Sequence, residues 1–280
     1  MGFYNPLAEN GKGKYEKTGI LRLIERANNN PETPYFLILD EMNLSHVERY
    51  FSDFLSHMET PDNPFELDGY KNKDKEDEEP TGKLPYPENL FVIGTVNIDE
   101  TTYMFSPKVL DRANVIEFKP DKEDVLSMFV KEGSRKKVLQ AKSGIAEAFL
   151  RLSKEIRSGI SNIAESQVLT VQSVFTGVYE ICEKNGYEFA FRTVKEIRQY
   201  LSAACSLSEQ WDDSSLYQAV DEQILQKVLP KIHGNRKEIG NMLDELEAFC
   251  KQSGRELPLS AMKIEQMKGK LAAVQYASFI

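Results

Sequence analysis

Two adjacent acids, Asp40 and Glu41, carry the clearest chemistry in the sequence. They follow an apolar run at residues 35–39, which Pro34 bounds at its other end. One carboxylate at such a position can help to hold Mg²⁺ through the water shell of the ion, and the other can orient or deprotonate an attacking water. The pair therefore indicates phosphoryl transfer, with Asp40 as the magnesium residue and Glu41 as the base. The alternative is a strand that ends in a solvated acidic turn.

The apolar run must position these acids. It is short, which is typical of a strand buried on both faces of a parallel sheet. Residues 90–97 form a second run of the same kind and end in Asn97. With the two strands as neighbours in one parallel sheet, Asn97 would lie beside Asp40 and Glu41. Its amide can hold the attacking water or the terminal phosphate, although asparagine also commonly forms the turn after a strand.

A cation follows in the next segment. Ser106 and Pro107 predict the start of a short helix, which leads to Arg112, and residues 114–118 predict a third apolar strand. Arg112 has two interpretations. It is a surface charge paired with Asp111, or it is an arginine finger that reaches the nucleotide of a neighbouring subunit, where one charge changes the rate by about 10³ to 10⁵.

The periodicity of the chain changes near residue 120. Before it, helices are expected at residues 18–28 and 47–58, between the strands. A charged stretch near residues 70–82 has almost no apolar side chains and predicts a mobile acidic insertion. After it, apolar residues recur at helical spacing. The expected helices lie at residues 121–132, 137–157, 168–185, 191–207, 216–228, 238–253 and 260–276. The fold class is therefore α/β followed by all-α, with a first domain at residues 1–120 and a helical domain at residues 121–280.

Composition limits the class of protein. The chain has 280 residues, of which 41% are hydrophobic and 28% charged, and no apolar stretch approaches the roughly 20 residues of a membrane-spanning helix. We expect a cytoplasmic protein that does not enter membranes. The three cysteines are widely spaced and predict reduced core residues rather than a zinc site. A formal charge of −9 repels a phosphate backbone, so DNA would be held by another domain or chain.

The sequence around these residues resembles the AAA+ nucleoside triphosphatases of the McrB type. The similarity lies in residues 37–44, 47–56, 94–102 and 105–113, and it continues through residues 191–197, 227–234 and 257–261. Proteins of this type are the motor subunits of modification-dependent restriction systems, and they typically hydrolyse GTP. The resemblance implies a parallel sheet with flanking helices, followed by a helical lid.

The same resemblance assigns roles to five residues. Asp40 would be the Walker B residue that binds Mg²⁺ through water, Glu41 the catalytic base, and Asn97 sensor 1. Arg112 would be the arginine finger. Arg192 would be sensor 2 in the nucleotide-binding set, with an exposed arginine on a lid helix as its alternative. GTP or ATP would be the substrate, and Mg²⁺ the cofactor.

One departure from the family is large. The sequence contains no G-x-x-x-x-G-K-[ST] phosphate-binding loop, and the residues before Tyr35 leave no room for the usual first strand, loop, helix and second strand. Loss of that first strand would leave inner backbone groups unpaired, at about 1–3 kcal/mol each. The chain is then a C-terminal piece of a longer protein, which we favour, or one half of a split gene, or a non-hydrolytic paralogue that donates Arg112 in trans.

These features lead to one expected function and two alternatives. The expected function is that of the C-terminal part of an AAA+ GTPase or ATPase. It would form a ring with copies of itself or with an upstream segment that bears the phosphate loop, hydrolyse nucleotide at subunit interfaces, and drive DNA translocation for a partner nuclease. The first alternative is an ATP-driven protein remodeller of the MoxR or dynein-related kind. The second is a non-catalytic assembly subunit, and the missing phosphate loop leaves the enzyme assignment open.

Overall fold

The computed structural model describes residues 2–5, 14–60, 62–66, 83–97, 104–129, 140–254 and 257–279. The expected acidic insertion near residues 70–82 lies outside these ranges. The chain divides into two units, one made of Met1–Val109 and Gly144–Lys154 and the other of Leu110–Ser143 and Glu155–Ile280. The division falls between Val109 and Leu110. The segment after Leu110 bonds to the helical unit, since the carbonyl oxygens of Asp111 and Ala113 accept from Lys227 Nζ.

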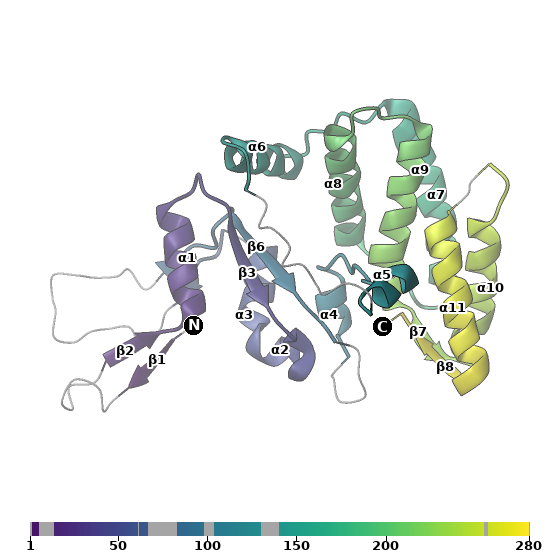
Figure 1. Ribbon diagram of the computed structural model, residues 1–280, viewed down its shortest axis with the longest axis horizontal. Coiled ribbons are helices and arrows are strands. Elements are labelled where there is room, and N and C mark those ends of the chain that lie inside the picture. The colour runs from purple at the N-terminus through teal and green to yellow at the C-terminus, as the bar shows by residue number, and fades with distance from the viewer. Residues whose placement is uncertain are drawn as a thin grey trace. The chain divides into compact units, whose positions relative to one another are not determined.

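Within the described residues, the first unit combines helices with three pairs of strands. Its elements are β1 (Gly2–Asn5), β2 (Lys14–Lys17), α1 (Gly19–Asn29), β3 (Tyr35–Leu39), η1 (Met42–Leu44), α2 (Val47–Tyr50), α3 (Ser52–Glu59), β4 (Phe65–Glu66), β5 (Lys83–Leu84) and β6 (Leu90–Gly94). The pairs β1–β2 and β4–β5 are antiparallel, whereas β3–β6 is parallel. Figure 1 labels two of these pairs, β1–β2 and β3–β6. Helix α4 (Pro107–Leu110) spans the division between the units.

Burial on both faces, which the two apolar runs predicted, was wrong for the described residues, but their pairing as neighbouring parallel strands is confirmed by the sheet of β3 and β6. Its register runs from Tyr35 opposite Leu90 to Leu39 opposite Gly94. On one face of this sheet, Leu37 and Leu90 are buried in a core with side chains of α1, α2 and α3. On the other face, Phe36 and Ile38 are 48% and 62% exposed. The sheet is therefore covered on one face and largely open on the other within the described residues.

The helices of this unit follow their apolar spacing. Helix α1 begins at the cap Thr18, whose side chain accepts a hydrogen bond from Leu21 N at 3.3 Å, and it buries Leu21, Ile24 and Ala27. The single helix predicted at residues 47–58 was wrong in one respect. The backbone leaves helical geometry at Phe51, and α2 and α3 result. The Phe51 ring stacks on Phe54 with centroids 4.6 Å apart, so the break still serves the core.

Asn89 joins the end of α1 to the sheet. It is 5% exposed, and its Nδ2 donates to the carbonyl oxygens of Ala27, Asn30 and Thr33 at 3.1, 2.9 and 2.7 Å. The backbone oxygen of Asn89 accepts a hydrogen bond from the backbone N of Tyr35, the first residue of β3, at 2.8 Å. One buried side chain thus satisfies the backbone of the turn that connects α1 to β3.

Replacing Asn89 with alanine should lower the free energy of unfolding by about 1–3 kcal/mol, because the buried carbonyl of Ala27 and two partly buried carbonyls lose their donor. Urea denaturation followed by circular dichroism measures this change. Asn29→Ala, at an exposed position of α1, is the matched control. A loss no larger than that of the control would show that Asn89 is not needed there.

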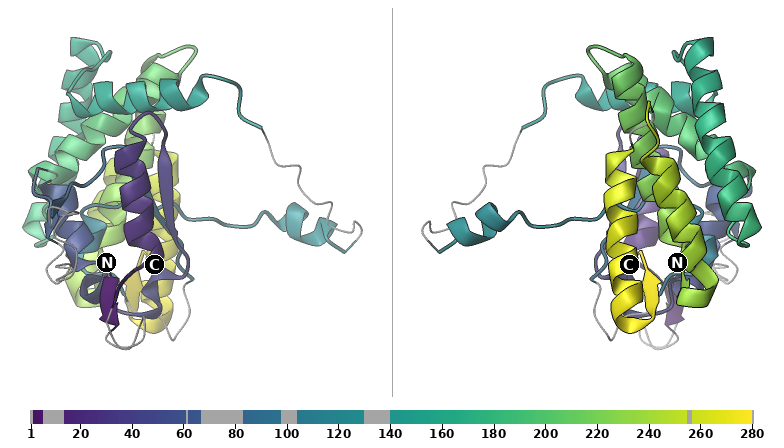
Figure 2. Two further views of the ribbon diagram at one scale, coloured as in Figure 1. Left: turned by 90° about the vertical axis from the view of Figure 1, so that its left-hand side faces the viewer. Right: turned by 90° about the vertical axis from the view of Figure 1, so that its right-hand side faces the viewer.

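The second unit is built mainly of helices. They are α5 (Lys122–Ser127), α7 (Glu165–Lys184), α8 (Phe191–Leu207), α9 (Asp213–Gln223), η2 (Ile224–Val228, a π-helix), η3 (Leu229–Lys231), α10 (Arg236–Cys250) and α11 (Pro258–Val274), and α6 (Ile145–Arg157) spans the division. Helices α10 and α11 lie side by side (Figure 2). Strands β7 (His233–Asn235) and β8 (Tyr276–Ser278) pair antiparallel.

The prediction of an all-α part after residue 120 is confirmed in outline, except for one pair of short strands. The third strand predicted for the first domain was wrong. Residues 114–118 form no strand. Ile116 and Phe118 are 62% and 90% exposed, and Val115 N donates to Gln226 O of η2 at 3.0 Å instead of pairing with a strand. The β7–β8 hairpin was not expected, because strands of three residues carry too little alternation to be read from sequence.

Gln223 lies at the C-terminus of α9 and is fully buried. Neither its Nε2 nor its Oε1 has a hydrogen-bond partner among the described residues. A buried amide without partners is destabilising. The position therefore favours an apolar side chain of the same length.

Gln223→Met should raise the free energy of unfolding by about 1–2 kcal/mol. The fluorescence of Trp211, the single tryptophan, reports unfolding of this unit in urea. The exposed Gln210→Met is the matched control. A lower stability for Gln223→Met would mean that this amide is bonded in the folded protein.

The structure also bears on the cysteines and on the expected lack of a membrane-spanning helix. Cys182 and Cys250 are buried and free, and burial raises the pKa of each thiol to about 12, as expected for core residues. Among the helices of the described ranges, none has both the length and the apolar stretch that a bilayer span requires.

Candidate functional site

The carboxyl ends of β3 and β6 bring together polar side chains from two distant segments. Asp40 and Glu41 follow β3, and Thr95 and Asn97 follow β6. The backbone continues the pairing past the strands, since Thr95 N donates to Leu39 O and Met42 N donates to Thr95 O, both at 2.9 Å. The side chains at this edge are therefore held on a hydrogen-bonded frame.

Thr95 connects the two acids. Its hydroxyl donates to Asp40 Oδ1 and accepts from Glu41 N at 2.8 Å. One side chain thus orients the first carboxylate and fixes the backbone of the second. Sequence analysis had not singled out Thr95. The signal available was a polar residue directly after a strand, two positions before Asn97.

Asn97 contacts the predicted base directly. Its Nδ2 donates to Glu41 Oε1 at 2.8 Å, and its backbone oxygen accepts from Asn43 Nδ2 at 3.1 Å. Asn43 is 3% exposed, and its Oδ1 has no hydrogen-bond partner in the described part of the chain. The sequence pattern did not indicate this role of Asn43 either. Asn43 holds the segment that carries Asn97 against the turn after β3.

Glu41 has an unusual backbone. Its φ and ψ are 50° and 47°, in the left-handed region, which costs about 1 kcal/mol or more for a residue with a side chain. Gly94, the last residue of β6, lies close to the residue that follows Glu41, because a Cβ on Gly94 would lie 1.9 Å from Met42 Sδ. Such strain commonly marks functional positions. Here it presents Glu41 toward Asn97.

The carboxylate pair suits a hard cation. Asp40 and Glu41 are exposed at the sheet edge, and Mg²⁺ typically uses one or two carboxylates together with water and phosphate oxygens. In the described ranges there is no group of three or more His, Cys, Asp or Glu side chains that could hold a metal alone. Asp40 and Glu41 therefore have the donor atoms that Mg²⁺ prefers, but the described residues do not form a complete metal cage.

The two predicted arginines lie in the second unit. Arg112 follows α4 in a turn, and Arg192 is the second residue of α8. Both are partly buried. The structure thus brings together three of the five predicted site residues, Asp40, Glu41 and Asn97, within one unit.

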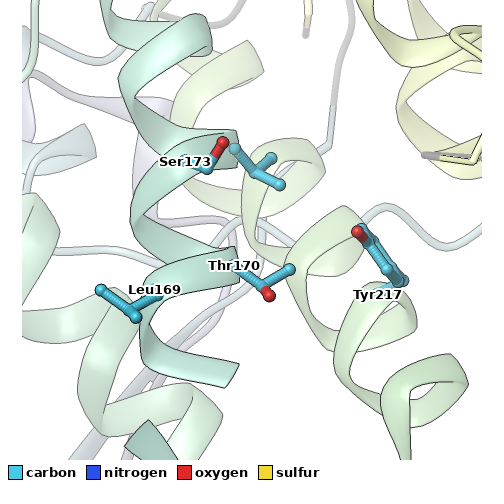
Figure 3. Close-up of a pocket in the computed structure, with 5 residues that line it drawn as sticks. Leu169, Thr170, Ser173 and Tyr217 are labelled. Carbon is cyan, nitrogen blue, oxygen red and sulfur yellow. The ribbon is translucent and has the colours of Figure 1, made fainter. Parts of the chain in front are cut away.

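A surface hollow between α7 and α9 offers no comparable chemistry (Figure 3). Its volume is about 360 Å³, and Leu169, Thr170, Ser173, Val174 and Tyr217 line it. Its polar groups are hydroxyls, and none of the five side chains is charged at neutral pH. The hollow lacks the converging polar groups of a specific ligand site.

Comparison with known proteins identifies one similarity. Residues 138–276 match a family model described as a domain of unknown function (DUF8727). The matched part includes Arg192 but not Asp40, Glu41, Asn97 or Arg112. No curated protein matches the chain, and no solved structure does.

Proposed function

We propose that this chain carries the Walker B and sensor 1 half of an AAA+ nucleoside triphosphatase of the McrB type. The observation that carries the proposal is the set of Asp40, Glu41, Thr95 and Asn97, joined by hydrogen bonds at the carboxyl ends of adjacent parallel strands. Ligands of open α/β sheets bind at this edge. The substrate would be GTP or ATP with Mg²⁺.

Each residue has a role in this proposal. Asp40 would hold Mg²⁺ through water, and the ion would neutralise charge on the phosphates. Glu41 would accept the proton of the attacking water. Asn97, which donates to Glu41 Oε1, keeps that carboxylate in place and offers its amide to the water or the terminal phosphate. Thr95 fixes both acids.

The phosphate-binding half would come from another segment. Parallel sheets are normally covered on both faces, yet Phe36, Ile38 and Ile93 are 48%, 62% and 46% exposed on the β3–β6 sheet. Phe149 of α6 packs on this face, with its ring centroid 4.8 Å from that of Phe91 and 6.0 Å from that of Phe36. The open face supports a partner that covers it with helices, which fits an upstream segment bearing a phosphate loop.

The wider role follows from the resemblance. The chain would assemble in a ring, and nucleotide hydrolysis at subunit interfaces would drive DNA translocation for a modification-dependent nuclease. The formal charge of −9 supports DNA contact through another domain or chain. A protein remodeller of the MoxR or dynein-related kind would use the same site.

A second candidate is a non-hydrolytic assembly subunit. Such a subunit would not need a G-x-x-x-x-G-K-[ST] phosphate loop, and the sequence contains none. Such a subunit would donate Arg112 to a neighbour and would need neither Asp40 nor Glu41.

Turnover of GTP and ATP separates these proposals. It is measured for this chain alone, for an upstream segment that carries a phosphate loop alone, and for their mixture. Turnover in the mixture only would support a divided site. No turnover in the mixture, together with stimulation of an intact AAA+ neighbour, would favour the non-hydrolytic subunit.

A further inference from the structure

Lys231 contacts the immediate neighbours of both predicted arginines. Its Nζ pairs with Asp111 Oδ1 at 2.5 Å and donates to Thr193 Oγ1 at 3.0 Å. Asp111 precedes Arg112 in the turn after α4, and Thr193 follows Arg192 in the first turn of α8. One ammonium group therefore joins two segments that lie far apart in the sequence.

Lys227 holds the same turn from inside the unit. Its side chain is fully buried, and its Nζ donates to the carbonyl oxygens of Asp111 and Ala113 at 2.9 and 3.0 Å. It also forms an ion pair with Glu196 of α8. Burial lowers the pKa of Lys227, and the contact with Glu196 opposes that shift. A buried ammonium is costly unless its hydrogen bonds are made, and this one has three acceptors.

The backbone around Lys227 is specialised as well. Lys227 lies in the π-helix η2, a rare geometry that is frequent at functional sites. Gln226 O of the same turn accepts from Val115 N at 3.0 Å. Farther along, Glu117 pairs with Lys263 of α11 at 2.8 Å. The segment from Asp111 to Glu117 is thus fastened to the helical unit at several points.

We propose that Lys227 and Lys231, the lysine clamp, are positioning residues that hold the Arg112 turn and the first turn of α8 as one rigid element. Two ammonium groups and the carboxylates of Asp111 and Glu196 balance in charge. Arg112 and Arg192 then keep a fixed separation within the helical unit. This inference rests on the proposed role of Arg112 in hydrolysis.

A double-mutant cycle tests the clamp in the hydrolysing mixture. Lys231→Met should lower kcat about tenfold and leave KM unchanged. The substitution displaces the guanidinium of Arg112, which is proposed to act on the transition state. Lys231→Arg should recover part of kcat. In an Arg112→Ala background, Lys231→Met should lower kcat by a clearly smaller factor, because the part of its effect that acts through Arg112 is already lost. Lys195→Met, at an exposed position of α8, is the control. Equal losses in both backgrounds would refute the clamp.

Hydrogen exchange gives a readout that is independent of hydrolysis. The amides of Ala113 and Val115 should exchange about tenfold faster in Lys227→Met and in Lys231→Met than in the natural chain. Unchanged exchange in both variants would overturn the clamp, whatever happens to turnover. Unchanged kcat in Arg112→Ala would instead remove the proposed role of Arg112, and the exchange result would still decide whether the clamp exists.

Discussion

Glu41→Gln should lower kcat for nucleotide hydrolysis by about 10² to 10⁴ while nucleotide binding persists. The amide has the size of the carboxylate and can still accept the hydrogen bond from Asn97 Nδ2, which spans 2.8 Å to Glu41 Oε1. It cannot take a proton from water. The change therefore removes the proposed base and leaves the frame of β3, β6 and Thr95 intact.

Steady-state turnover and nucleotide affinity, both measured in the mixture with the phosphate-loop segment, check this prediction. Glu32→Gln is the control. It replaces the carboxylate of an exposed residue before β3 with an amide, as Glu41→Gln does, and it should leave kcat unchanged. Glu41→Asp keeps the charge but shortens the side chain, so it should lose activity through a poorer approach to water and Asn97. A Glu41→Gln variant with normal kcat would exclude Glu41 as the base.

Arg112→Ala should lower kcat by about 10³ to 10⁵, the usual effect of losing an arginine finger. A guanidinium stabilises the charge that develops on the transferred phosphoryl group. Arg112→Lys should recover only part of the rate, because an ammonium lacks the planar fork of donors. The exposed Arg22→Ala is the matched control.

Mixing two inactive variants shows whether Arg112 acts across an interface. Subunits with Arg112→Ala keep Glu41, and subunits with Glu41→Gln keep Arg112. Together they should form some interfaces with both groups intact and regain measurable turnover. No recovery from a mixture that assembles would place the action of Arg112 within its own subunit or exclude it from catalysis.

The parts of the fold that follow from local pattern were predictable. Two short apolar runs that end in Asp40 and Asn97 predicted a parallel pair, and β3 and β6 form it. The helical spacing predicted α8 with the bounds Phe191 and Leu207 that the structure has. In both cases the apolar residues within the element itself form the pattern, so the element can be predicted without knowledge of its distant contacts.

The features that depend on distant contacts were not predictable. Residues 114–118 have the composition of a strand, but the hydrogen bond from Val115 N to Gln226 O fastens them to the π-helix. Lysines are rarely buried, so nothing in the sequence marks Lys227 as a core residue. The role of Thr95 depends on the left-handed backbone of Glu41, which no spacing rule predicts for a residue other than glycine.

The central claim is that Asp40, Glu41 and Asn97 face a metal–nucleotide complex. Replacing Mg²⁺ with paramagnetic Mn²⁺, in the mixture with a slowly hydrolysed nucleotide, tests it directly by nuclear magnetic resonance. We predict selective broadening of the amide signals of residues 40, 41, 95 and 97, which requires both nucleotide and the phosphate-loop segment. If nucleotide is bound and those signals are not broadened, or if the broadening lies at a different site, then Asp40, Glu41 and Asn97 do not face the metal–nucleotide complex.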